Sequence, residues 1–152
     1  MGYTHYWNFK PSELKGWEAK IADCDKIIAA RKAALELDLT SSDATQIWLN
    51  GPDDGRDLGH ETFDMPRTLA GVEARVINSP SYRSEGMEGF DFCKTARKPY
   101  DEVVVACLCV LAESGLDVSS DGDAGEWEDG RKLAEEVLGR PISTPARVRE
   151  DS

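Results

Sequence analysis

The feature that most constrains the fold is the run VVVACLCVLA at residues 103–112, which contains no charged or strongly polar side chain. Pro99 precedes it at a place suited to the first turn of a helix, and Gly115 follows where a left-handed residue would end one. A helix that is apolar on every side has to be buried on most of them. We therefore expect residues 103–112 to form the central packing element of the protein.

Alternating and helical patterns predict the other elements. Alternation and aromatic strand formers favour strands in GYTHYWNFK (2–10), QIWLNG (46–51), HETFDMP (60–66), EARVI (73–77), FDFCKT (90–95) and LDVSS (116–120). The second and third of these form a hairpin with a long loop. Apolar residues at spacings of three and four predict a helix from about Glu13 to Glu36 with Ser12 as its N-cap. A third helix follows Asp123, which is spaced from Glu126 as in a capping box.

These elements indicate an α+β fold, in which a mostly antiparallel sheet carries about three helices packed on it. The 152 residues fit one domain with a substantial core, and 40% of them are apolar. We assign residues 1–140 to a single α+β domain and residues 141–152 to a flexible C-terminal tail. Residues 78–89, NSPSYRSEGMEG, read as an exposed, mobile loop.

The net charge limits the partners that the protein can have. At −11, it argues against duplex DNA, RNA or an anionic membrane as the main partner, since these bind through Lys and Arg. A small anion in a local basic pocket is compatible with it, and self-association is left open. The four cysteines form no CxxC pair, so no zinc site, other metal or cofactor is expected. Without a secretory signal or a long apolar run, we expect a cytoplasmic protein with reduced thiols.

The basic cluster in FCKTARKPYD stands out against this acidic background. Lys94, Arg97 and Lys98, with Thr95 between them, come directly before the expected start of the central helix. The first N–H groups of a helix have no intrahelical partners and carry partial positive charge, so they bind anions readily. This predicts an anion site. The alternative is that the cations face water or pair with acidic residues, and Asp101 in the first turn would compete for the same N–H groups.

Aromatic residues near the N-terminus could hold the planar part of such a ligand. His5 lies between Tyr3 and Trp7 on one face of the first strand, and rings of this kind stack on bases. The alternative is that His5 is a buried histidine held by hydrogen bonds and that the rings belong to the core.

Three further groups have side chains capable of chemistry. His60 and Glu61 could bind a ligand or a metal or act as acid and base, although two histidines in the chain leave little for a His-rich metal site; the alternative is a solvated hairpin end. Asp121 in SSDG could bind a sugar, or it could shape a turn before the last helix. The cations and helix start near Cys93 would lower a thiol pKa, whereas a buried cysteine would be inert.

A family resemblance rests on GYTHYW (2–7), HETF (60–63), FCKTARKPYD (92–101), SSDG (119–122) and EW (126–127). Together these motifs resemble a family of small uncharacterised proteins of bacteriophages and bacterial genomes, and the resemblance spans nearly the whole chain. It implies a phage or prophage source, and hence the host cytoplasm. It implies no activity and no catalytic residues.

The sequence thus leads to one hypothesis and two alternatives. The hypothesis is a phage-type protein that binds an anionic, nucleotide-like small molecule and sequesters a host immune signal. The first alternative is a hydrolase or transferase on such a substrate that uses Cys93, or His5 paired with Asp121. The second is an acidic protein-interaction module.

Overall fold

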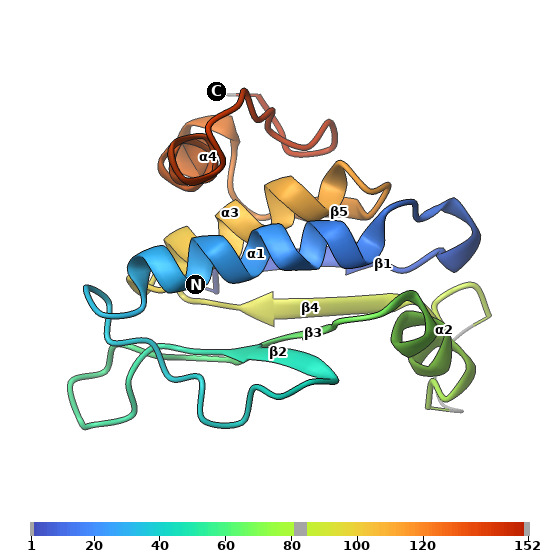
Figure 1. The fold of residues 1–152 in the computed structure, drawn as a ribbon, viewed down its shortest axis with the longest axis horizontal. Coiled ribbons are helices and arrows are strands. Elements are labelled where there is room, and N and C mark those ends of the chain that lie inside the picture. The colour runs from blue at the N-terminus through green and yellow to red at the C-terminus, as the bar shows by residue number, and fades with distance from the viewer. Residues whose placement is uncertain (1, 81–84, 151–152) are drawn as a thin grey trace.

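The computed structural model describes residues 2–80 and 85–150, which form an α+β fold as expected (Figure 1). One sheet has the order β4-β1-β5, with β1 (Thr4–Asn8) in the middle and antiparallel to both β4 (Phe90–Lys94) and β5 (Asp117–Ser120). A second sheet is the antiparallel hairpin of β2 (Gln46–Leu49) and β3 (Phe63–Pro66). The predicted strands at these places are confirmed.

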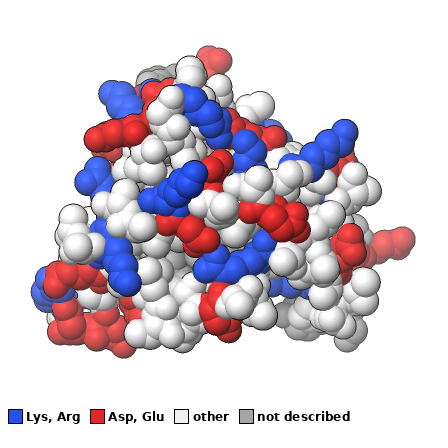
Figure 2. Space-filling model, viewed as in Figure 1, with Lys and Arg blue, Asp and Glu red and all other residues white. Residues whose placement is uncertain are grey.

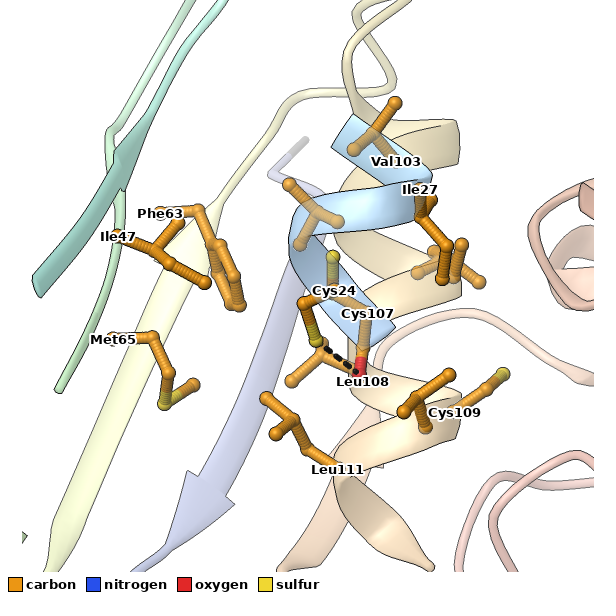
Figure 3. Packing of buried hydrophobic residues seen from close by; sticks show 14 of the residues in the cluster. Cys24, Ile27, Ile47, Phe63, Met65, Val103, Cys107, Leu108, Cys109 and Leu111 are labelled. Carbon is orange, nitrogen blue, oxygen red and sulfur yellow. Dashed lines mark hydrogen bonds between the residues drawn. The ribbon is translucent and has the colours of Figure 1, made fainter. Parts of the chain in front are cut away.

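The sheets lie side by side, and helices cover one of their faces. Figures 1 and 3 show β3 running next to β4, where the Glu61 N–H donates to the Lys94 carbonyl at 3.1 Å. In Figure 3, Ile47, Phe63 and Met65 point from the β2–β3 side toward α1 (Trp17–Arg31) and α3 (Asp101–Ala112). The hydrophobic core therefore lies between the strands and these two helices.

Helix α3 is the central element that the apolar run predicted. No residue from Val103 to Leu111 exposes more than 1% of its surface. The helix packs against α1 and against α4 (Ala124–Leu138), which Figure 1 shows on the side away from the strands. This position explains why α3 needs apolar side chains all round. No helix among residues 2–80 and 85–150 is long and apolar enough to cross a bilayer.

The first helix begins later than the sequence predicted. Residues Pro11–Glu13 form a short 3₁₀ turn, η1, and α1 starts only after Gly16, which has the left-handed φ of 64°. Between them, the Lys15 N–H donates to the Ser114 carbonyl, and the Ser114 hydroxyl donates to the Lys15 carbonyl. These bonds hold the chain extended against the end of α3, so Ser12 caps no long helix and that prediction is wrong.

The predicted strand at residues 73–77 is also wrong, because this segment lies in helix α2 (Leu69–Ile77). The Thr68 hydroxyl accepts the Gly71 N–H and caps the helix, while Val72 points into the core. Arg75 then reaches Asp64 of β3 at 2.6 Å. Part of the expected loop that follows, residues 81–84, lies outside the described residues.

The C-terminal part of the chain is packed over most of its length. The Asp123 carboxylate accepts the Glu126 N–H, as the capping box predicted, and α4 ends at Gly139. Beyond it, where we expected a flexible tail, Ile142 and Val148 are buried in the core. The described residues 141–150 thus contribute to the domain.

Candidate functional site

One end of the β4-β1-β5 sheet brings together segments that are far apart in the sequence. Antiparallel pairing places the start of β1 beside the ends of β4 and β5, with His5 opposite Cys93 on one side and Ser120 on the other. The first turns of α3 and α4 lie at the same end, since Asp101 and Trp127 both contact this network. Most of the residues singled out in the sequence meet here.

A buried chain of hydrogen bonds crosses this end of the molecule. The His5 ring is fully buried; its Nε2 lies 2.6 Å from Asp101 Oδ1, and its Nδ1 lies 2.7 Å from Ser120 Oγ. The Thr95 hydroxyl donates to the same Asp101 oxygen at 2.6 Å. His5 therefore links β1 to β5 and to α3, and Asp101 links α3 to the end of β4.

The donors around Ser120 determine where the protons of this chain lie. Its Oγ accepts the indole N–H of Trp127 at 3.1 Å and the Gly122 N–H at 2.9 Å. Because a hydroxyl oxygen has two lone pairs, the Ser120 proton must be donated to His5 Nδ1. The proton of the imidazole then sits on Nε2 and is donated to Asp101. The network thus fixes one tautomer of His5.

Aromatic rings enclose the histidine. Tyr3 and Trp127 each meet the His5 ring edge-on, with centroids 5.1 Å apart. Burial, reinforced by the nearby Asp101 charge, raises the pKa of Tyr3 well above its ordinary value. A Cβ at Gly122 would lie 2.2 Å from the Tyr3 hydroxyl oxygen, so the chain needs a glycine where it passes this ring.

This arrangement resembles a serine hydrolase relay, but it leaves the serine no direction of attack. The four tetrahedral directions at Ser120 Oγ are taken by its own Cβ, by the proton given to His5, and by the N–H groups of Trp127 and Gly122. The pair of His5 with Asp121 considered for the enzyme alternative does not form, because His5 contacts Asp101 instead. These hydrogen bonds therefore form a structural network in which no group is left to react with a substrate.

The thiol of Cys93 is also inaccessible to a substrate. Its side chain is fully buried, and its Sγ lies 3.5 Å from the Glu61 carbonyl oxygen. Burial raises the pKa of Cys93 well above its ordinary value, and the charges of Glu61 and Asp101 act in the same direction. Of the two alternatives for Cys93, the structure therefore supports the buried, inert thiol, because desolvation and acidic neighbours disfavour its charged form.

The start of α3 has few N–H groups left for an anion. The N–H groups of Asp101, Glu102 and Val103 donate to the carbonyls of Lys98, Pro99 and Tyr100 in the turn before the helix. The helix starts at Asp101, two residues after Pro99, because this turn precedes it. An anion site in this region consequently depends on side chains.

Two of the three predicted cations already have acidic partners. Arg97 Nε and Nη2 lie 3.1 and 2.9 Å from a single oxygen of Glu126, and Lys98 Nζ lies 3.0 Å from Asp57. The Arg97 guanidinium carbon also sits 4.1 Å above the centre of the Tyr3 ring. Figure 2 shows the same mixing of blue and red residues over the face that it presents.

Lys94 differs from the other two cations. Its backbone N–H donates to Glu61 Oε1 at 2.9 Å, but within residues 2–80 and 85–150 its ammonium group has no ion-pair partner. Its side chain belongs to the face of β4 opposite Cys93, and thus to the sheet face turned away from the helices. Lys94 is therefore the cation of the cluster with unused charge.

The turn between β4 and α3 is strained. Ala96 and Arg97 have φ values of 53° and 58°, in the left-handed region that non-glycine residues rarely occupy. The N–H groups of Thr95 and Ala96 both donate to the Tyr3 carbonyl, which holds the turn against the start of β1. Strain of this kind gathers at functional sites because surrounding contacts must maintain it.

The remaining predicted residues lie at the border of this cluster, apart from it or inside the core. Trp7 is buried with its ring edge-on to Phe63, at a centroid distance of 5.6 Å. His60 is exposed at a hollow of about 550 Å³ beside an acidic loop. The Glu61 carboxylate accepts a hydrogen bond from the backbone N–H of Lys94 in β4. Asp121 accepts from the Thr4 N–H and the Tyr6 hydroxyl. In the part of the chain that is described, no group of three His, Cys, Asp or Glu residues could hold a metal ion.

Sequence reasoning missed Phe92 as a binding residue; it lies opposite Tyr6 on the outer sheet face. Strand alternation could have identified it, because it places Phe92 on the face that does not carry Cys93.

Comparisons with protein-family models, with curated proteins and with solved structures found no match to this chain.

Proposed function

We propose that the protein binds an anionic small molecule at the end of the β4-β1-β5 sheet, with Lys94 as the primary contact for its negative group. The observation that carries this proposal is the ammonium group of Lys94, which has no ion-pair partner among residues 2–80 and 85–150 and lies beside the strained turn that holds Arg97. A cation without a partner in a protein of charge −11 is a specific place for an anion to bind.

Arg97 is the second contact in this proposal. Its side chain is 57% exposed, and both of its bonded nitrogens share one carboxylate oxygen of Glu126, whose side chain is 39% exposed. A phosphate or carboxylate could replace that oxygen and offer two oxygens to the same two N–H groups. Glu126 thus occupies the place beside Arg97 that an anionic group would take.

Binding without turnover fits the side chains better than catalysis does. Ser120 Oγ has no open direction, and the Cys93 thiol is buried with a raised pKa. We propose, as the motifs and the basic cluster suggest, that a phage-type protein of this kind sequesters a nucleotide-like host immune signal. Sequestration requires only that the ligand be held and released unchanged.

The test is calorimetry with inorganic pyrophosphate on the wild type and on matched charge variants. Lys94→Ala and Arg97→Ala should each weaken binding by about tenfold or more, which is the loss of one charge-assisted hydrogen bond. Lys132→Ala, on the exposed side of α4, removes the same charge elsewhere and should change affinity little. Glu126→Gln should strengthen binding several-fold, because Arg97 loses its internal competitor.

Two results would contradict the proposal. Equal affinities for Lys94→Ala, Arg97→Ala and the Lys132→Ala control would mean that the basic cluster binds no anion. Chromatography of the ligand after incubation tests the enzyme alternative, since new products would show that the protein catalyses a reaction.

A further inference from the structure

Three aromatic rings lie on the face of the sheet opposite His5, Cys93 and Ser120. Tyr6 and Phe92 are direct partners in the β1–β4 register, so their side chains stand on the same face, and Phe90 lies two residues before Phe92. His5, Cys93 and Ser120 occupy the opposite face, toward α3 and α4. Strand alternation therefore places the three rings together on the outer face.

The rings form one contiguous surface. Tyr6 stacks with Phe90 at a centroid distance of 6.2 Å and an interplanar angle of 25°, and Phe90 lies 6.0 Å from Phe92 at 37°. Phe92 leaves 45% of its surface exposed, although most large apolar side chains of the described residues are buried. An exposed, preassembled aromatic surface commonly marks a binding site.

This surface can accept a planar group, whereas the rings predicted for that role cannot. Tyr3 and Trp7 each expose only 2% of their surface, and His5 exposes none. The Arg97 guanidinium covers the Tyr3 ring, and the Trp7 ring packs against Phe63 in the core. A planar ligand would have to displace these side chains to reach the two rings, but it can stack on Phe92 without moving the backbone.

The charges around the rings determine how such a ligand would be oriented. Lys94 follows Phe92 by two residues on the same strand face, which places their Cα atoms about 7 Å apart. On the β5 side, Asp121 accepts from the Tyr6 hydroxyl at 2.9 Å and from the Thr4 N–H at 3.0 Å, and this hydrogen bond raises the pKa of Tyr6. A negative group would be repelled by Asp121 and attracted by Lys94, so it should lie on the β4 side.

We infer that Phe92 and Tyr6 form the subsite for the planar part of the ligand, and that Lys94 binds its anionic group. The ligand class is an aromatic ring that carries a phosphate or similar anion about 7 Å away, as nucleotides do. This inference rests on the proposed function. It adds the part of the binding site that recognises the planar ring of the ligand. A nucleic acid strand is a poor occupant, because each further phosphate would meet the acidic background.

The experiment compares ligands with and without a planar base. Calorimetry on the wild type should show ADP and UDP binding roughly tenfold or more tighter than inorganic pyrophosphate, as expected for stacking of one base. Phe92→Ala should remove that advantage and leave the pyrophosphate affinity unchanged. Phe92→Tyr should retain it, because another ring fills the same place.

The control variant is Ile77→Ala, which truncates a side chain that is 80% exposed on α2. It removes exposed apolar surface on another element and should leave all three affinities unchanged. If ADP and UDP bind no tighter than pyrophosphate, or if Phe92→Ala keeps their advantage, the subsite is overturned while anion binding stands. If pyrophosphate and both nucleotides all fail to bind the wild type, the proposed function itself fails.

Discussion

The Ser120→Ala substitution tests the buried network most directly, because one hydroxyl serves three partners. The change removes the acceptor of the Trp127 and Gly122 N–H groups and the donor to His5 Nδ1. A buried polar group left without its partner costs about 1–3 kcal/mol. Three such groups at the lower end of that range give a loss of about 3 kcal/mol in the free energy of unfolding.

Thermal and urea denaturation measure this loss. In a domain of 152 residues, about 3 kcal/mol corresponds to a decrease of roughly 6–12 °C in Tm. Ser119→Ala is the matched control, since Ser119 is the next residue of β5, faces the other side of the sheet and makes no side-chain hydrogen bond within the described residues. It should change stability by no more than about 0.5 kcal/mol.

The comparison between the two serine variants tests whether Ser120 has the hydrogen-bonding role assigned to it. If Ser120→Ala is no less stable than Ser119→Ala, the assignment of donors and acceptors around His5 is wrong. If Ser120→Ala instead folds normally but abolishes a measured turnover, Ser120 is a nucleophile and the closed-network argument fails.

Two further predictions concern the core and an ion pair. Val104→Asp places an unpaired charge in the fully buried helix α3 and should cost several kcal/mol; an unchanged urea midpoint would contradict the central position of this helix. Hydrogen bonding to Arg140 lowers the pKa of Glu113 below its ordinary 4.5, so Glu113 contributes stability above about pH 4.5 that is lost as the pH falls through the lower, folded-state pKa. Glu113→Gln should therefore lower Tm at pH 7 and make Tm decrease less as the pH falls. Glu136→Gln, at an exposed position of α4, should have neither effect.

Local patterns were sufficient wherever a segment's own chemistry decided its structure. The apolar run at residues 103–112 could only be stable as a buried helix, and the structure confirms it. Alternation identified β1 and β4, and the spacing of Asp123 and Glu126 identified the start of α4. In each case, the interactions that define the element lie within a few residues of one another.

Local patterns failed where distant contacts overrode them. The periodicity of residues 13–36 continues through Gly16, but the helix cannot begin earlier because Ser114 holds the backbone of Lys15 extended. The segment at residues 73–77 is rich enough in apolar residues for a strand, yet the Thr68 cap makes it helical. Propensity over five residues is a weak preference that one cap or one long-range bond can reverse.

The sequence by itself determined which residues are candidates for a site: the basic cluster, His5 and the aromatic strand are all local features. Only the tertiary structure decided their roles. Arg97 is neutralised by Glu126, His5 is held by Asp101, and Lys94 keeps its charge because no acidic side chain of the described residues reaches it. The physical reason is that an electrostatic interaction depends on distance in space and on burial, and residues far apart in the chain set both.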